Sequence, residues 1–361
     1  MTHHTFLSLL MACLLSVIAG HLGAQETSAP NTPEAMLLNI QKQLAAGQAD
    51  LALTSANTLV EKFPHFRLGH LIRGDILQAR TRPLKTLGDT TKATQQEDRL
   101  NDLRQEARGR FQAVTQRPAR NKLPDMLIQL GQEQQHLLVV DTAQSRLYWF
   151  SNMQGTPHLQ ADYYITIGKA GVLKQNDGDQ KTPLGIYRIT GNIPGEKLTD
   201  FYGKGALTLN YPNTWDRQHG RTGYGIWLHG VPRESYSRPP KASNGCVVLS
   251  NPDMTALLQK IPTGTPVVIT QKIKWLDLEA WTQARAAFVQ DFKPNLPANL
   301  SIRAEEVSVF RYPSQENVVQ ITLPAALTTK HQARSRKSVV DQYWAFDGQF
   351  WHPVTAPSTT S

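Results

Sequence analysis

Between residues 136 and 270 the chain is a succession of short apolar runs separated by turn residues, and this texture restricts the fold most. Such runs, rich in Val, Ile, Tyr and Trp and bounded by glycine or proline, predict β-strands. They include HLLVVDTAQSRLYWF (136–150), ADYYITIGKAG (161–171), GIWLHG (225–230) and TGTPVVITQKI (263–273). One clear helix is predicted among them, NPDMTALLQKI, with Asn251 as its capping residue. The segment from about Leu123 to Lys274 is therefore predicted to be a compact, mainly-β domain.

Upstream of this segment the apolar residues follow helical spacing. MLLNIQKQLAAGQADLALTSANTLVEKFPHF (36–66) predicts two helices, with Gly47 at the turn between them and Pro64 after the second. The positions of Gly47, Ala52, Leu59 and Pro64 resemble the second half of a tetratricopeptide repeat. Only about one and a half repeats are visible, fewer than the roughly three that a solenoid needs. We therefore predict a small helical domain at residues 35–118, which is the candidate surface for a homodimer or a protein partner.

Downstream, a predicted helix (LDLEAWTQARAAFVQDF) is followed by two hairpins with turns at PSQEN and DGQ. This order predicts an α+β module at residues 276–354. Aromatic pairs stand at the strand ends of the second hairpin, Tyr343/Trp344 and Phe350/Trp351. We interpret these aromatic residues as hydrophobic core in preference to a ligand cage.

The first 25 residues differ from the rest. FLSLLMACLLSVIA (6–19) is apolar and uncharged, and it is too short to span a bilayer, which takes about 20 apolar residues. Small residues follow it, which predicts a secretory signal peptide at residues 1–25 with cleavage near Ala24. The absence of Lys and Arg before the apolar block is unusual for such a leader. No second apolar stretch follows, so we expect no stable membrane insertion after signal cleavage.

The net charge of +9 gives an exported protein several anionic surfaces to meet: lipid, nucleic acid or a cell wall. Export argues against nucleic acid. Lys and Arg are scattered, apart from KHQARSRK (330–337), which we interpret as a solvated loop. No HExxH, CxxC or spaced His/Asp/Glu set for zinc, no Walker A sequence and no GxSxG elbow occurs. No metal and no cofactor are predicted.

Cys246 is the one cysteine left after removal of the leader, which holds Cys13. A lone cysteine in an oxidising compartment is either a reactive thiol or a small apolar filler, and composition alone favours the filler. His229 ends the run GIWLHG, 17 residues before Cys246, and a long loop joins the two. Two adjacent strand ends would bring imidazole and thiol within hydrogen-bond reach, with Gly245 allowing close backbone approach. The alternative is that His229 is a strand-end histidine that only forms a hydrogen bond with a turn.

Three motifs in order resemble the L,D-transpeptidase catalytic domain: GDQKTPLGIY, IWLHG and SNGCVVLSNPDM. The resemblance covers roughly residues 136–273, and we place the catalytic domain at residues 130–273. It implies that Cys246 is the nucleophile and His229 its base, and that the Gly230 carbonyl orients the imidazole. It also implies that Gly245, with Ser243 and Asn244, shapes an oxyanion-binding loop made of the amides of residues 245 and 246. The Thr-Pro-x-Gly turn of the family corresponds to residues 182–185.

The sequence departs from the family pattern at two positions. The family's His before Gly-Cys is Asn244 here, whose side chain can still form hydrogen bonds. The Arg usually found two residues after the cysteine is Val248. This loss leaves open how a substrate carboxylate is held. Candidate substitutes in the preceding loop are Arg233, Arg238 and Lys241.

The three segments in this order resemble exported enzymes that trim peptidoglycan and end in a nuclear-transport-factor-2-like module. The predicted fold class is thus multidomain: a tetratricopeptide-like helical segment, a mainly-β catalytic domain and a C-terminal α+β module. The resemblance implies a periplasmic enzyme that acts on peptidoglycan stem peptides through a Cys246 thioester. An amine acceptor gives transpeptidation, and water gives L,D-carboxypeptidase activity. A catalytically lapsed wall-binding scaffold is the alternative of another class, motivated by Asn244 and Val248.

Overall fold

A computed structural model describes residues 32–89, 96–292, 306–324 and 339–354. The predicted signal peptide and the basic run at 330–337 lie outside these residues. The chain forms two compact units, one of residues 1–116 with 232–240 and one of residues 117–231 with 241–361. Each unit is described by itself.

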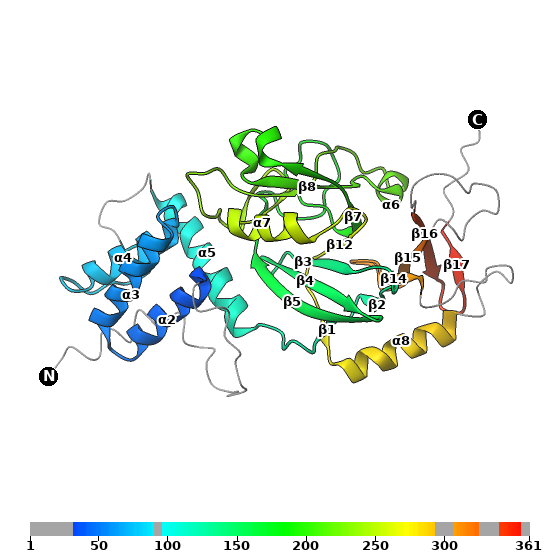
Figure 1. Cartoon of the computed structure of the whole chain (residues 1–361), viewed down its shortest axis with the longest axis horizontal. Helices are drawn as coiled ribbons and strands as arrows, with labels where there is room; N and C mark the ends of the chain where they lie inside the picture. The colour runs from blue at the N-terminus through cyan, green and yellow to red at the C-terminus, as the bar shows by residue number, and fades with distance from the viewer. Residues whose placement is uncertain (1–31, 90–95, 293–305, 325–338, 355–361) are drawn as a thin grey trace. The chain divides into compact units, whose positions relative to one another are not determined.

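The first unit is helical, as predicted, and its helices appear in blue and cyan in Figure 1. They are α2 (Pro33–Ala45), α3 (Ala49–Lys62), α4 (Arg67–Gln78) and α5 (Glu97–Thr115). The Thr32 side chain accepts a hydrogen bond from the Ala35 amide and caps α2, and proline follows at the first helical position. Gly47 turns the chain between α2 and α3 with φ +73°. The likeness to a tetratricopeptide repeat stays a prediction.

The second unit is built on an eight-stranded mixed sheet, which confirms the mainly-β prediction. In spatial order the strands are β11 (Val247–Val248), β9 (Trp227–His229), β8 (Gly205–Leu209), β7 (Gly185–Pro194), β12 (Pro266–Thr270), β3 (His136–Asp141), β4 (Arg146–Met153) and β5 (Thr156–Tyr164). β11 runs parallel to β9, and β12 runs parallel to β3; the other neighbours are antiparallel. Helix α7 (Asn251–Lys260) follows β11.

The central strands bury both faces, which explains why they read as continuous apolar runs. In β3, Leu138 and Val140 enter one hydrophobic cluster with Met254 of α7. Leu137 and Val139 alternate with them and enter a second cluster on the other face. The sheet therefore separates two cores, and α7 covers only the first.

The start of α7 differs from the prediction. Ser250, not Asn251, is the capping residue: its side chain accepts a hydrogen bond from the Asp253 amide. Asn251 and Pro252 then occupy the first two helical positions. Both Ser and Asn favour the capping position, so composition does not separate them. The shift by one residue leaves the Asn251 side chain available for contacts away from its helix.

The C-terminal segment forms a five-stranded antiparallel sheet and the helix α8 (Leu278–Phe292), as the two hairpins predicted (Figure 1). The strands are β17 (Trp351–Pro353), β16 (Val339–Phe346), β15 (Val318–Pro324), β14 (Ser308–Arg311) and β2 (Leu127–Gln129). The edge strand β2 comes from before the catalytic segment. The C-terminal module is thus joined to the preceding domain by a shared sheet, and both belong to one unit.

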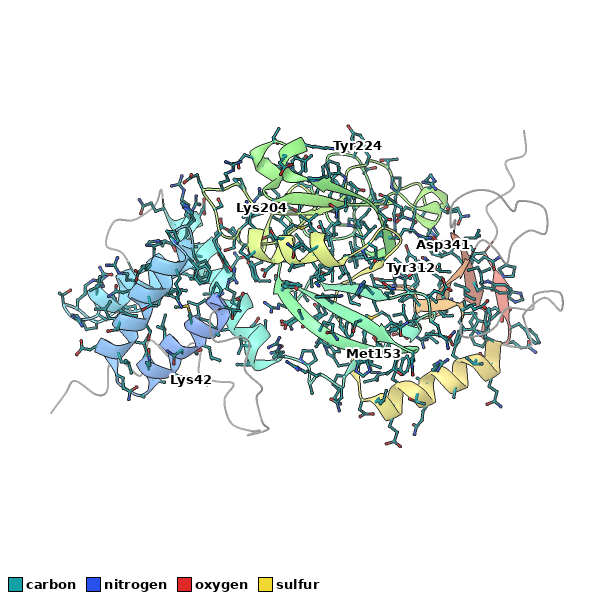
Figure 2. All side chains as sticks on the ribbon, viewed as in Figure 1. Lys42, Met153, Lys204, Tyr224, Tyr312 and Asp341 are labelled. Carbon is teal, nitrogen blue, oxygen red and sulfur yellow. The ribbon has the colours of Figure 1, made fainter. Side chains whose placement is uncertain are left out.

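Side chains add to this junction. Tyr312 and Tyr343 pack against Trp215 of the short helix α6 (Thr214–Gln218). Asp341 forms an ion pair with Arg188 of β7; Tyr312 and Asp341 are labelled in Figure 2. Of the aromatic residues interpreted as core, Tyr343, Trp344 and Trp351 are buried. Phe350 is exposed, because it lies in the turn of the hairpin.

Candidate active site

The sheet places the strand that ends in His229 directly beside the strand that follows Cys246. β9 and β11 are parallel neighbours, with Leu228 opposite Val247 and His229 opposite Val248. The Leu249 amide donates to the His229 carbonyl oxygen at 2.9 Å. Strands paired in this way lie about 4.8 Å apart. The two predicted strands are therefore neighbours, but His229 ends β9 whereas Cys246 precedes the start of the parallel strand β11.

The pleat sets which way these residues face. Leu228 and Val247 both enter the hydrophobic cluster that contains α7. Their neighbours His229 and Val248 face away from this cluster, because successive side chains in a strand alternate. Cys246 stands two residues before Val248, where the strand begins. Because the two strands are parallel and Val247 lies opposite Leu228, Cys246 lies level with Trp227, two residues before His229 along the pair. The contact of its Sγ with the Gly225 carbonyl oxygen agrees with this position.

The His229 ring has a defined orientation. Its Nδ1 lies 2.7 Å from the Gly230 carbonyl oxygen. A carbonyl oxygen only accepts hydrogen bonds, so Nδ1 carries a hydrogen and the neutral ring has its basic lone pair on Nε2. This is the orienting contact that the family resemblance implies for Gly230.

Two aromatic rings surround the imidazole, and no sequence motif indicated them. Phe201 and Tyr202 belong to the 3-10 turn η2 (Asp200–Tyr202), and their ring centroids lie 5.6 and 5.0 Å from that of His229. His229 is 1% exposed, whereas Phe201 is 43% exposed. The base is therefore shielded from bulk water by an aromatic side chain that itself faces solvent.

Asn251 holds the backbone around His229. Its Nδ2 donates to the Val231 carbonyl at 2.8 Å, and its Oδ1 accepts from the amides of Val231 and Lys204 at 3.2 and 3.1 Å. A Cβ at Gly230 would lie 2.3 Å from the same Oδ1. The glycine after the histidine is therefore required by the close approach of this amide. One side chain fixes both the segment after His229 and the loop that carries Tyr202.

The nucleophile loop is closed by Ser243. Its Oγ donates to the Cys246 carbonyl at 2.6 Å and accepts from the Gly245 amide at 3.1 Å. The Gly245 amide was expected to donate to an oxyanion, but it donates within the loop. Ser243 ends β10 (Lys241–Ser243), which pairs with β6 (Ile167–Gly168).

Thr182, from the Thr-Pro-x-Gly turn, also holds the nucleophile loop through hydrogen bonds. Its Oγ1 donates to the Gly245 carbonyl at 2.8 Å and accepts from the Gly168 amide at 2.9 Å, and the residue is fully buried. Gly245 has φ +123°, and a Cβ there would lie 2.7 Å from the Lys181 carbonyl oxygen. Only glycine fits this position without strain.

The segment that precedes Thr182 is itself tightly bonded. Lys174 is buried and donates to Asp179 at 2.8 Å, and the amides of residues 175, 176 and 181 donate to the same carboxylate. Burial opposes ionisation of Asp179, but the hydrogen bonds from Lys174 and from these amides outweigh it and lower the pKa of Asp179 to about 2. The conformation of residues 174–181, which precede Thr182, thus depends on an ionised aspartate.

Cys246 is half-buried, and its thiol is not in a disulfide. Its Sγ lies 3.3 Å from the carbonyl oxygen of Gly225, to which it can donate. Tyr224, the residue before Gly225, is 79% exposed and is labelled in Figure 2. A half-buried thiol differs from the fully buried filler that composition alone favours.

The other predicted site residues are placed differently. Asn244 is exposed, and Ser243 and Thr182 hold the turn that was expected to use its side chain. Val248 is 2% exposed and lies in the sheet, so it offers no polar group to a substrate. Lys241 is exposed at the start of β10. Arg233 and Arg238 lie in the segment 232–240, which groups with the helical unit.

Asn251 and the two rings of η2 were missed as site residues. A signal for Asn251 was present: two capping residue types stand side by side in SNPD, and only one can cap. No such signal exists for the η2 rings, because the segment reads as a loop. Within the described ranges, no group of His, Cys, Asp or Glu could hold a metal ion. None of the helices described is long and apolar enough to cross a membrane.

Comparison with known proteins places this site in a family context. Residues 135–269 match the family model of the L,D-transpeptidase catalytic domain, YkuD. The chain is 28% identical over 205 residues to the protein named "Probable L,D-transpeptidase ErfK/SrfK" of Escherichia coli (strain K12). This match covers 48% of the chain and 61% of that relative, so the chain spans less than two thirds of the relative's length.

Two solved structures are similar over a larger share of the chain. Bd1075 of Bdellovibrio bacteriovorus has a TM-score of 0.48 and 23% identity, and it covers 66% of this chain and 100% of its own. The helical cell shape determining protein Pgp2 of Campylobacter jejuni has a TM-score of 0.48 and 18% identity, covering 64% and 94%. At these values the two structures establish neither a shared overall fold nor a shared activity.

Proposed function

We propose that the protein is a cysteine acyl-transfer enzyme acting on peptidoglycan stem peptides, because residues 135–269 match the family model of the L,D-transpeptidase catalytic domain. The observation that carries the proposal is the hydrogen bond from His229 Nδ1 to the Gly230 carbonyl. It leaves the basic lone pair on Nε2, on the strand that pairs with the one directly after Cys246. Nucleophilic catalysis by a thiol requires a base with a fixed tautomer, and we assign this role to His229 toward the half-buried thiol of Cys246.

In the first step, His229 Nε2 takes the proton of the Cys246 thiol. The thiolate attacks the carbonyl carbon of the third residue of a tetrapeptide stem and forms a tetrahedral oxyanion. We assign the oxyanion contact to the Cys246 amide, because the Gly245 amide donates to Ser243. The imidazolium then gives its proton to the leaving amine of the terminal D-residue, and a thioester is left on Cys246.

In the second step, a nucleophile attacks the thioester and the thiol is released. An amine acceptor forms a new peptide bond, which is transpeptidation. Water forms a carboxylate and leaves a tripeptide stem, which is L,D-carboxypeptidase activity. The family supports the donor chemistry, and the transpeptidase is our first candidate because the matched family is named for transfer.

The test is incubation of the protein with purified disaccharide–tetrapeptide fragments, followed by mass spectrometry of the products. We expect Cys246→Ala and His229→Ala each to lower the rate by at least about 1,000-fold. A 3–3 cross-linked dimer would identify the transpeptidase. A tripeptide stem that forms with wild type but not with Cys246→Ala would identify the carboxypeptidase.

Fragments that stay unchanged with the wild-type protein would contradict both enzymatic proposals and leave the wall-binding scaffold. Thr190→Val is a suitable control, because this exposed threonine of β7 lies outside the site. Its rate is expected to equal that of wild type.

We further propose that the protein acts in the periplasm, as the apolar leader at residues 6–19 indicates. The C-terminal sheet with α8 is proposed to be a nuclear-transport-factor-2-like module. The helical unit is proposed to carry the contact with a second copy or another protein. Protease protection in intact cells with the outer membrane either sealed or permeabilised tests the location. Light scattering of the wild type beside a protein lacking residues 1–116 tests the association.

A further inference from the structure

The chain between the proposed base and the proposed nucleophile leaves its own unit. Residues 117–231 and 241–361 form one compact unit, but the nine residues 232–240 group with the helices. His229 and Cys246 stand on either side of this segment. The helical unit therefore contains a piece of the active-site connection, which we call the anchor segment (232–240).

Tyr236 inserts the anchor segment into the core of the helical unit. Its ring contacts those of Phe63 and Phe66 edge to face, with centroids 5.2 and 5.1 Å apart. Phe66 is fully buried, and the Arg110 guanidinium lies over its ring at 5.0 Å. Edge-to-face pairs of this kind are favourable beyond the area they bury, so Tyr236 is a specific contact and not a loop side chain lying on a surface.

Ser237 connects the anchor segment to a buried charge network. Its Oγ donates to Glu106 Oε1 at 2.6 Å. Glu106 and Arg110 are each 2% exposed and form an ion pair at 2.9 Å, and Arg110 also pairs with Glu34 of α2. A buried carboxylate needs all of its donors, so the Ser237 hydroxyl is part of what satisfies Glu106.

Both ends of the anchor segment are held in the catalytic unit. At one end, both backbone groups of Val231 are bonded to Asn251. At the other end, β10 begins at Lys241 and pairs with β6. Prolines stand at the joints, at positions 232, 239 and 240, and proline fixes φ. A displacement of the anchor segment must therefore act on the short stretches that end in His229 and Cys246.

We propose that Tyr236 and Ser237 are positioning residues for the active site, through which the helical unit sets the geometry of His229 and Cys246. This inference rests on the proposed function, in which His229 is the base and Cys246 the nucleophile. It gives the helical unit a part in the reaction that is separate from any contact with a second copy or another protein. Release of the anchor lets the two loops move independently, and the thiol loses its fixed relation to the imidazole.

The test measures the reactivity of Cys246 and needs no wall substrate. The full chain is treated with iodoacetamide from pH 5 to pH 9, and alkylation of the Cys246 peptide is followed by mass spectrometry. We expect Tyr236→Ala and Ser237→Ala to change the alkylation rate at pH 7 at least about threefold and to shift its pH midpoint, because thiolate formation depends on the imidazole. Tyr236→Phe keeps the ring and is expected to restore the wild-type profile, as is Ser237→Thr.

Leu51→Ala is the matched control in the helical unit, since Leu51 of α3 is 49% exposed and outside the anchor contacts. Its profile is expected to match wild type. Circular dichroism shows whether each variant keeps its helices. If Tyr236→Ala loses them, Ser237→Ala, which removes one oxygen, decides the question alone.

An unchanged alkylation profile in a folded Ser237→Ala protein would overturn the proposal. The same holds if Tyr236→Phe fails to restore what Tyr236→Ala changes. Turnover of wall fragments, measured in parallel, distinguishes failure of the proposed function from failure of the coupling through the anchor segment. If the profile responds to the anchor variants but wild type converts no fragment, the proposed function fails and the coupling stands. If wild type converts fragments and neither anchor variant alters the profile, the coupling fails and the proposed function stands.

Discussion

The two loops that meet at the candidate site are held by different means. The base loop, residues 229–231, is fixed by one distant amide side chain, Asn251, which bonds three backbone groups. The nucleophile loop, residues 243–246, is fixed by two hydroxyl groups, from Ser243 and Thr182, which each bond two of its backbone or neighbouring groups.

The difference matches what each loop has to keep constant. The base needs a ring of fixed tautomer, and a clamp on the backbone beside it keeps the Gly230 carbonyl in place. The nucleophile needs a sharp turn, and hydroxyl groups that both donate and accept can close a turn from within. The nucleophile loop therefore depends on its own backbone conformation, and the base loop depends on the position of helix α7.

The largest expected effect comes from Gly245→Ala, which attacks the backbone of the nucleophile loop. At φ +123° an alanine is strained, and its Cβ would lie 2.7 Å from the Lys181 carbonyl oxygen. We expect a loss of about 2–3 kcal/mol in the free energy of unfolding and a reduced rate of Cys246 alkylation. Denaturant unfolding measures the first and mass spectrometry the second.

Two controls separate the causes. Gly220→Ala also has a positive φ, +68°, but its Cβ would meet nothing within 4 Å, so it isolates the backbone strain. Asn244→His, next to Gly245, changes an exposed residue and is expected to stay within about 0.5 kcal/mol of wild type. Equal losses for Gly245→Ala and Gly220→Ala would show that crowding at Lys181 is unimportant.

An intermediate effect is expected when each clamp is removed in turn. Thr182→Val leaves the buried Gly245 carbonyl and Gly168 amide without their partner, and Asn251→Ala removes three hydrogen bonds. Each is expected to lower the free energy of unfolding by about 2 kcal/mol. Their kinetic effects should differ: Thr182→Val lowers the alkylation rate, whereas Asn251→Ala shifts its pH midpoint, because it releases the base.

Asn192→Ala is the control for the amide clamp, since this exposed asparagine donates one hydrogen bond, to the Leu258 carbonyl. It should leave both the rate and the midpoint unchanged. If Thr182→Val and Asn251→Ala alter the same kinetic quantity to the same extent, the base loop and the nucleophile loop are not held independently.

The smallest expected effect concerns Asp179, in the segment 174–181 that precedes Thr182. The pKa of Asp179 is lowered to about 2, so its ionised form stabilises the folded protein above about pH 4, and this stabilisation is lost as the pH falls towards 2. Asp179→Asn is expected to cost about 1–2 kcal/mol at pH 7 and less as the pH falls below 4. Thermal unfolding of both proteins from pH 7 to pH 3 measures the difference. A difference that does not narrow below pH 4 would contradict the assignment.

The sequence predicted the part of the site that local pattern can specify. Apolar runs ending in His229 and beginning after Cys246 predicted two strand ends, and the structure pairs these strands. The shape of the C-terminal sheet followed from its two hairpins, each with its own turn signal. In each case the deciding contacts lie between runs that are strongly patterned on their own.

The clamps and the anchor could not be predicted in this way. Asn251 reaches residues 20 and 47 positions away, and Tyr236 and Ser237 reach Phe63 and Glu106, more than a hundred positions away. The anchor segment reads as a flexible loop because Pro, Ser and Arg dominate it, and periodicity carries no information about a partner in another unit. The pairing of edge strand β2 with β14 could not be predicted for the same reason, because the two strands lie far apart along the chain.

The anchor segment also decides when the helical unit can be complete. A chain that emerges with its N-terminus first presents α2 to α5 early, but the piece that packs on Phe63 and Phe66 appears only after residue 231, behind most of the eight-stranded sheet. Until then Glu106 lacks its Ser237 donor. The unit that comes first in the sequence therefore cannot reach its final form until residues 232–240 have emerged, and its last step closes a loop of more than one hundred residues.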